Sequence, residues 1–298
     1  MNAYFVGSER PARHIVATMS SKLRPTASAG VLWGIMGAFM AFLTLSLALG
    51  LFALPLYKFE RSISGRITAT GLSGPEFFFG FAITTAISLV TSPLYGIGFV
   101  IAVLLHETVT ALACRHLGYD VARVRLVPLP WVAQPRCDHA HERDIDEVFE
   151  ALYGPALAIV PMALSFSLFH VLSAPAPQLA EAFRAIAIML GCFNFVVLLP
   201  FLPFAGGRAV RAVSASFWPQ LAPAVTVFMT AAFATAALRD GSIAMGVLAA
   251  VGAQSLLHRK QPDQQRLSPN EALLIMACYA FTMTVHFLGG FGLLKGAI

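Results

Sequence analysis

Long apolar stretches with few or no charged side chains recur along most of this chain, and they constrain its fold more than any other feature. A helix crosses the roughly 30 Å hydrocarbon core of a bilayer with about 20 predominantly apolar residues. The chain is 57% hydrophobic and 12% charged, with a mean hydropathy of +0.73, which is far from the balance of a soluble domain. The sequence therefore predicts an integral membrane protein that has the lipid bilayer as its first partner.

We predict an all-α polytopic protein with about eight membrane-spanning helices. The stretch 77–117 is too long for one span and carries the turn sequence "TSPLYG" around Pro93, so it divides into two helices. The stretch 30–56 is longer than the apolar core of a signal peptide and should remain in the mature protein. The other predicted spans are 154–172, 182–204, 221–238, 243–257 and 272–294.

The net charge of +5 fits a membrane protein and gives no reason to expect nucleic acid as a partner, because basic residues commonly flank membrane spans on the cytoplasmic side. If the chain leaves the membrane into the cytoplasm at Leu117, most later basic loops lie inside. The basic N-terminal arm would then lie outside, so the side of the N-terminus stays open. We expect a bacterial inner membrane, because no targeting segment is evident. The four cysteines are scattered and predict no disulfide framework.

Composition divides the chain into four regions. Val and Leu alternate with Arg123 and Arg125 in the polar stretch after residue 118, which predicts a strand there. The regions are a polar basic arm at 1–29, N-terminal transmembrane segments at 30–93, a core at 94–213 that includes the polar segment 118–150, and C-terminal transmembrane segments at 214–298.

The predicted span before Leu117 contains "LLHETVTALACRHLGY" at 104–119, which begins like the zinc helix of a metalloprotease. In the motif H-E-x-x-H the two histidines share one helix face and bind zinc, while the glutamate activates the bound water. Here His106 and Glu107 are present, but Thr110 stands in the place of the second histidine. Ionisable residues at membrane depth are costly, so this pair is a candidate functional site.

Several segments, in this order, resemble the site-2 protease family of intramembrane zinc metalloproteases. "HETVTALACRHLGY" is similar to its zinc helix and "VARVRLVPLP" to its membrane-associated β-hairpin. "EALYGPALAIV" at 150–160 is similar to its A-x-x-G-P helix start, and "LLPFLPFAGGR" at 198–208 to its L-L-P-x-x-P-L-D-G-G-R segment. The resemblance covers roughly 94–213. It implies a site-2 protease-like core with a small cytoplasmic β-hairpin within 118–150.

The resemblance also implies roles for individual residues. His106 corresponds to the first zinc ligand and Glu107 to the general base, whereas Thr110 and Ala205 replace the other two ligands. A catalytic zinc normally takes three protein ligands and keeps one position for water. A threonine hydroxyl is a poor zinc ligand and alanine offers none, so the inherited site retains one ligand. No bound cofactor is expected in this interpretation.

The segment 198–208 adds further site candidates. Its prolines break the hydrophobic run and let the backbone line a cavity, while its glycines permit the turn that follows. An asparagine that often precedes the first proline in the family is Val197 here, and Asn194 lies one helical turn earlier. These site candidates are Pro200, Pro203, Gly206 and Gly207.

Other histidines offer an alternative ligand set. His116 lies about 15 Å along the helix from His106 and cannot complete the same site. Cys137, His139 and His141 form "CDHAH" in the polar segment, and a peripheral metal site or a loop that folds back over His106 stays open. Without a metal, Glu107 should be protonated and hydrogen-bonded to Thr110 or His106. This cluster would then fill the cavity that holds the metal in the resembling family.

We therefore expect a pseudoprotease: a metalloprotease-like membrane protein without zinc catalysis, which binds or regulates the transmembrane segment of a partner or belongs to a membrane complex. The alternative is an active zinc-dependent intramembrane metalloprotease with an altered ligand set that recruits His139 or His141. A transporter is disfavoured, because corresponding halves show no pair of interrupted helices.

Overall fold

The computed structural model describes residues 66–70, 74–125, 136–137, 139–257 and 264–297. The predicted span 30–56 and the N-terminal arm lie outside the described residues. The described elements are β1 (Arg66–Thr70), α3 (Gly74–Val90), α4 (Pro93–His116), β2 (Val121–Arg125), α5 (Asp144–Leu172), α6 (Pro177–Val197), α7 (Ala205–Phe217), α8 (Leu221–Asp240), α9 (Ile243–Leu257) and α10 (Pro269–Ala297).

Five of the described helices are long and apolar enough to cross a membrane, which agrees with the predicted membrane class. They are α4, α5, α6, α8 and the part of α10 up to Gly292. The apolar stretch of α3 and the whole of α9 are shorter, and the 15 residues of α9 extend about 22 Å. The count of about eight spans stays a prediction.

The helix ends differ from the bounds of the predicted spans, and two of these differences have a local cause. α5 begins at Asp144, well before the predicted start at 154, because Asp144, Asp146 and Glu147 in its first turn suit the positive end of a helix dipole. α6 ends at Val197 within the predicted span 182–204, because the proline-containing segment 198–204 interrupts the apolar run, as predicted from its prolines. The amphipathic helix α7 follows that segment and was not predicted.

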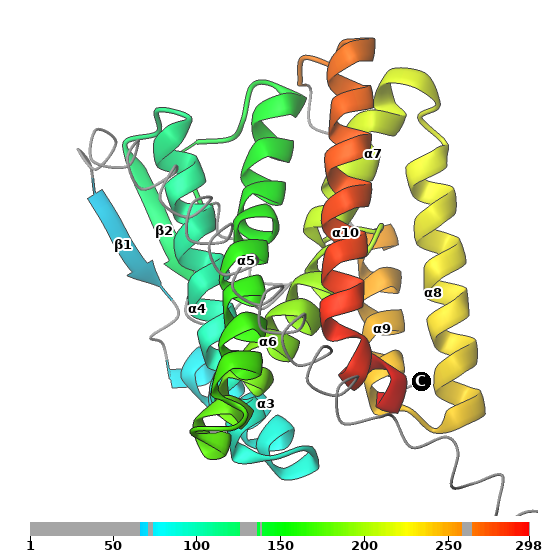
Figure 1. Ribbon diagram of the computed structural model, residues 1–298. Helices are drawn as coiled ribbons and strands as arrows, with labels where there is room; N and C mark the ends of the chain where they lie inside the picture. The colour runs from blue at the N-terminus through cyan, green and yellow to red at the C-terminus, as the bar shows by residue number, and fades with distance from the viewer. Residues whose placement is uncertain (1–65, 71–73, 126–135, 138, 258–263, 298) are drawn as a thin grey trace, which may run out of the picture.

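Helices α4, α5 and α6 pack on one another at the centre of the fold, and α10 packs against α6 (Figure 1). Ala102, Met162 and Leu190, one from each central helix, share a buried apolar cluster. At the α6–α10 crossing, Gly191 faces Gly289 and Gly290 so closely that any side chain there would meet backbone atoms. Small residues permit this approach, as in many membrane helix pairs.

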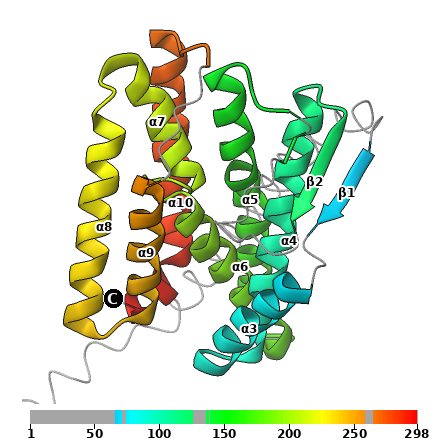
Figure 2. The same cartoon turned by 180° about the vertical axis from the view of Figure 1, so that it is seen from behind.

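Helices α8 and α9 form a hairpin on the side of the fold away from the strands, as both views show (Figures 1 and 2). Gly241 links them with a φ of 63°, a left-handed conformation that glycine adopts without strain. Large apolar side chains on α8 and α3 are exposed, including Phe228 and Phe77. Apolar side chains on the outer surface of a membrane helix suit contact with lipid.

The predicted strand after residue 118 is present as β2, but its ladder partner was not predicted. β2 pairs in parallel with β1, with Arg66 opposite Val121 and Thr70 opposite Arg125. The expected hairpin within 118–150 is represented, among the described residues, by one isolated antiparallel bridge between Ala122 and Cys137. Residues 126–135 lie outside the description.

Candidate functional site

His106 lies buried in the middle of α4 and is bonded to α6. Its Nδ1 lies 3.0 Å from Oδ1 of Asn194, and Nδ2 of Asn194 donates to the carbonyl of Leu190 at 2.9 Å. Since Asn194 presents its oxygen to the ring, Nδ1 of His106 is the donor. The ring of Phe193 covers the imidazole edge-on, with centroids 5.4 Å apart. Asn194 thus orients the ring of His106. The sequence had left open whether Asn194 plays a part at this site.

Thr110 uses its hydroxyl on the backbone of its own helix. Its Oγ1 donates to the carbonyl of His106 at 2.8 Å, and the residue is fully buried. Helix α5 closes over this point at Gly154, where an added Cβ would lie 2.5 Å from Oγ1 of Thr110 and 3.0 Å from Nδ1 of His106. The position that resembles a second zinc ligand is therefore tightly packed.

Glu107 forms an ion pair with Arg136, a partner from the polar segment that was not among the neighbours on α4 expected from the sequence. Oε1 of Glu107 lies 2.6 Å from Nη2 of Arg136, and Glu107 has no exposed surface. Burial acts against the guanidinium charge, but the charges of Glu107 and Glu150 outweigh it, so the pKa of Arg136 is raised. A cation from the polar segment therefore covers the carboxylate that resembles a general base.

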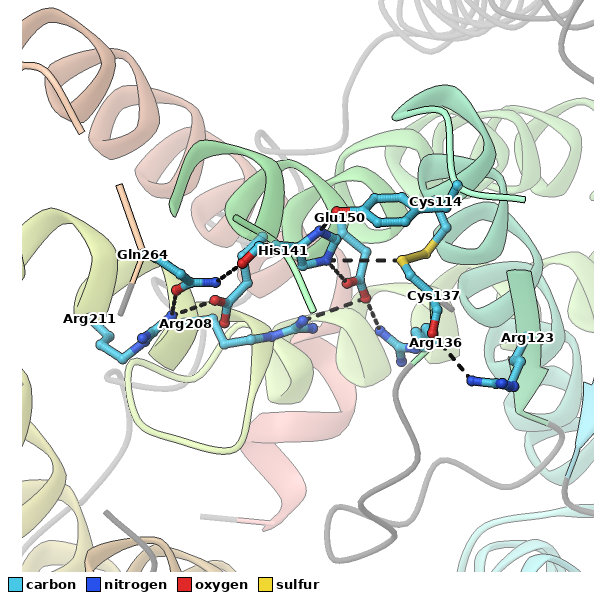
Figure 3. A network of polar contacts seen from close by, with 11 residues as sticks. Cys114, Arg123, Arg136, Cys137, His141, Glu150, Arg208, Arg211 and Gln264 are labelled. Carbon is cyan, nitrogen blue, oxygen red and sulfur yellow. Dashed lines mark hydrogen bonds and ion pairs between the residues drawn. A yellow bond between two sulfur atoms is a disulfide. The ribbon is translucent and has the colours of Figure 1, made fainter. Parts of the chain in front are cut away.

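Glu150 at the start of α5 connects this ion pair to the rest of a buried network (Figure 3). Its Oε1 lies 3.3 Å from Nη1 of Arg136 and 3.5 Å from Nη1 of Arg208 on α7. Its Oε2 lies 2.7 Å from Nε2 of His141. Two cations and an imidazole thus satisfy one buried carboxylate, and the network ties α4, α5 and α7 to the polar segment.

A second group of charges extends the network toward α10. Nη2 of Arg211 lies 2.5 Å from Oε2 of Glu147 and 3.8 Å from Oδ1 of Asp144. Gln264 accepts from Arg211 at 3.3 Å and donates to the carbonyl of His141 at 3.0 Å (Figure 3). These bonds hold the start of α5 against α7 and the segment before α10.

Cys114 and Cys137 form a disulfide, so the expectation of no disulfide was wrong (Figure 3). Their Cα atoms are 5.8 Å apart, within the usual range for such a bridge. The bridge joins the last turns of α4 to the residue beside Arg136. The cysteines are 23 positions apart and share no sequence motif, so the pairing had no recognisable signal.

The described histidines His139, His141 and His286 have partners other than His106. His141 bonds to Tyr119 at 2.6 Å and to Glu150, while the exposed His139 lies against the ring of Tyr119. His286 on α10 is buried and donates from Nε2 to the carbonyl of Pro155 at 2.7 Å.

The segment 198–204 and the first turn of α7 are packed together. An added side chain at Gly206 would meet the carbonyl of Leu198, and one at Gly207 would meet Phe201. These glycines therefore serve close backbone approach at the start of α7. Ala205 is buried and offers only a methyl group at the position that resembles the third zinc ligand. Pro200 and Pro203 flank the buried Phe201, and the peptide bond before Pro203 is cis.

An apolar cavity of about 510 Å³ lies between α7, α8 and α10. Val213, Leu221 and Met276 are among its lining residues. Its lining is apolar apart from Tyr279, whose hydroxyl donates to the carbonyl of Leu198 at 2.8 Å.

The chain matches no family model, no curated protein and no solved structure.

Proposed function

We propose that this chain is a site-2 protease-like membrane protein that has lost zinc catalysis and binds the transmembrane segment of a membrane protein partner. The observation that carries the proposal is the ion pair between Arg136 and Glu107, with a separation of 2.6 Å at a fully buried carboxylate. A general base must take a proton from a metal-bound water. A guanidinium held on this carboxylate competes with such a water for the carboxylate oxygen.

The surroundings of His106 support the same proposal. Catalytic zinc needs three protein ligands, and two of the three inherited positions hold Thr110 and Ala205. The hydroxyl of Thr110 is bonded to the backbone, and Gly154 leaves no room for a larger side chain without movement of α5. Restoring zinc would therefore require repacking as well as new ligands.

Close packing is retained around the positions that lack a zinc ligand. This supports a binding role over a site that has lost all function. Gly154 packs on the motif helix, and Gly206 and Gly207 allow α7 to approach the proline segment closely. Pro203 is exposed within that segment. In the resembling family this segment lies beside the substrate, so the exposed proline turn is the proposed contact with a partner.

Proteolysis tests the first half of the proposal. The full chain, its Glu107→Gln variant and its Arg136→Ala variant would each be co-expressed with single-span reporter proteins, and cleavage would be followed by immunoblot. We expect the same absence of specific cleavage in all three. Cleavage by the natural chain that disappears in Glu107→Gln would establish an active protease and refute the proposal.

Photo-crosslinking tests the second half. A photo-reactive amino acid at Leu202, next to Pro203, would be compared with one at Phe228, which is 70% exposed on α8. We expect a discrete adduct with a single-span protein from Leu202 and only diffuse lipid labelling from Phe228. Equal patterns from the two positions would argue against a specific partner site at the proline segment.

One observation favours the alternative of an active zinc protease with altered ligands. Asn194 orients His106 through Nδ1, and metal-binding histidines are commonly oriented by such a bond on the other ring nitrogen. That alternative predicts zinc in the purified chain that is lost in His106→Ala.

A further inference from the structure

A second cluster of metal-ligating side chains lies beside the ion pair, and it is distinct from the inherited zinc position at His106. Sγ of Cys114, Sγ of Cys137 and a carboxylate oxygen of Glu150 all lie within 4.8 Å of one another, and all three residues are buried. His141 adjoins them, with Nε2 at 4.0 Å from Sγ of Cys137 and 2.7 Å from Oε2 of Glu150. Thiolate, imidazole and carboxylate are the protein ligands of zinc.

The spacing suits a tetrahedral ion once the sulfurs are free. Zn–S bonds of about 2.3 Å and Zn–N bonds of about 2.0 Å place two sulfurs about 3.8 Å apart and a sulfur about 3.6 Å from a nitrogen. The 4.0 Å between Cys137 and His141 is close to the second figure. The oxygen of Glu150 and the nitrogen of His141 would move apart by about 0.6 Å.

Tyr119 provides the outer support that such a histidine needs. Its hydroxyl lies 2.6 Å from Nδ1 of His141. At present Nε2 of His141 faces the carboxylate of Glu150, to which it donates, and Nδ1 lies beside the hydroxyl of Tyr119. A metal on Nε2 would move the ring proton to Nδ1, which would then donate to the same hydroxyl. Zinc-binding histidines are usually held by this kind of bond.

The charges of the buried network are compatible with replacing the disulfide by two thiolates and one Zn²⁺. The carboxylates of Glu107 and Glu150 face the guanidinium groups of Arg136 and Arg208. Two thiolates and one Zn²⁺ together add no net charge. A buried charge that is not compensated is costly, so a neutral addition is the kind that this network can accept.

The position of the loop gives the reason to expect reduced cysteines. If the chain leaves the membrane into the cytoplasm at Leu117, the orientation that places most of the later Lys and Arg inside, the polar segment 118–150 lies on the cytoplasmic side. Cytoplasmic thiols are kept reduced, and persistent disulfides are rare there. Two buried thiols beside an imidazole and a carboxylate form a metal site more readily than they remain free.

We propose that, when the disulfide is reduced, Cys114, Cys137, His141 and Glu150 bind one Zn²⁺ in a closed structural site, and that the disulfide is the metal-free oxidised state of that site. A dithiol reductant gives two hydrogens to the bridge and becomes a disulfide itself, leaving two protein thiols. Zinc binding then releases two protons from these thiols to solvent. This inference is independent of whether the chain cleaves or binds a partner.

The site would also control the ion pair that covers Glu107. Arg136 precedes Cys137 directly, and Cys137 is held to α4 by the disulfide or by the proposed zinc. Either link keeps the guanidinium within reach of Glu107. Reduction without zinc would remove that link and loosen Arg136.

Metal analysis of the full chain in detergent tests the proposal. Protein purified without oxygen and with a dithiol reductant would be equilibrated with Zn²⁺, desalted and analysed for zinc per chain, beside the same protein with its disulfide intact. We expect about one zinc in the reduced form and none in the oxidised form. The absence of zinc in the reduced natural chain would overturn the proposal.

Variants locate the ion. We expect Cys137→Ser and His141→Ala to lower the zinc affinity at least tenfold, and Tyr119→Phe to lower it about 10-fold to 100-fold. The matched controls are Cys192→Ser, which alters a free cysteine, and His106→Ala, which alters the inherited position, and both should keep the metal. Zinc that depends on His106 but not on Cys137 would refute the assignment.

Cobalt provides a measurement that needs no variant, in case a variant fails to fold. Co²⁺ added to the reduced natural chain should produce the ultraviolet charge-transfer band of thiolate ligation and the visible bands of a tetrahedral site. The oxidised chain should produce neither. An octahedral spectrum without the thiolate band would contradict the proposal.

Discussion

The replacement Arg136→Ala is expected to destabilise the protein by about 3–4 kcal/mol. The structure sets this magnitude in two ways. Removing one member of a buried ion pair typically costs 3–5 kcal/mol, because the remaining charge is left without a partner. Here Glu107 has no exposed surface and its oxygen lies 2.6 Å from the guanidinium that would be lost.

The free-energy cost of an unpaired carboxylate in the variant has an upper limit, which is the cost of neutralising that group with a proton. A glutamate can escape an unpaired charge by taking up a proton, and from an ordinary pKa of about 4.3 this costs about 3.7 kcal/mol at pH 7. Glu150 keeps Arg208 and His141, so its share of the loss is smaller. The upper limit of about 3.7 kcal/mol lies within the usual range of about 3–5 kcal/mol for broken buried pairs, which gives the expected loss of about 3–4 kcal/mol.

The assay is unfolding in mixed micelles with increasing SDS, with the disulfide intact in every variant. Arg184→Ala is the matched control, because Arg184 pairs with Glu181 at an exposed site where such pairs contribute about 0.2–1 kcal/mol. The double variant Arg136→Ala with Glu107→Gln should recover most of the lost stability, since a neutral amide needs no counter-charge. A loss no larger than that of Arg184→Ala, or no recovery in the double variant, would refute the reasoning.

Three further perturbations have expected outcomes in the same unfolding assay. Asn194→Leu should cost about 1–3 kcal/mol, because it leaves the buried imidazole on α4 without its partner, and a neutral effect would show that the bond is dispensable. Gly191→Val should lower stability by about 1–3 kcal/mol or more, because the new side chain would meet α10. Gly292→Val is the control and should be near neutral, because Gly292 has open space around it. Equal effects would contradict the close crossing of α6 and α10 at Gly191. Reducing the bridge between Cys114 and Cys137 in the presence of a chelator should lower stability by about 3 kcal/mol for a separation of 23 residues, and an unchanged midpoint would count against a structural role.

Hydropathy predicted most of the described helices, because the cost of unpaired backbone groups in lipid leaves an apolar stretch few alternatives to a helix. The errors arose where local chemistry interrupts the apolar pattern. Acidic residues before Gly154 extend α5 beyond its apolar part, and the prolines after Val197 end α6 inside an apolar run.

The candidate site was predicted only in part. The sequence placed His106, Glu107 and Thr110 on one membrane helix, and α4 contains all three buried. Arg136 was missed, because a lone arginine in a polar loop has no pattern that links it to a residue 29 positions earlier. The partner of His106 comes from 88 positions away, on a helix whose rotation is decided by packing.

The sequence by itself indicated that this protein belongs in a membrane and where most of its long helices lie, since these depend on local composition. The tertiary structure alone decided how each buried polar group is satisfied: Asn194 on His106, Arg136 on Glu107, and Cys137 on Cys114. The physical reason is that a buried charged or polar group pairs with whichever partner the packing brings within about 3 Å. The distance along the sequence does not limit that choice.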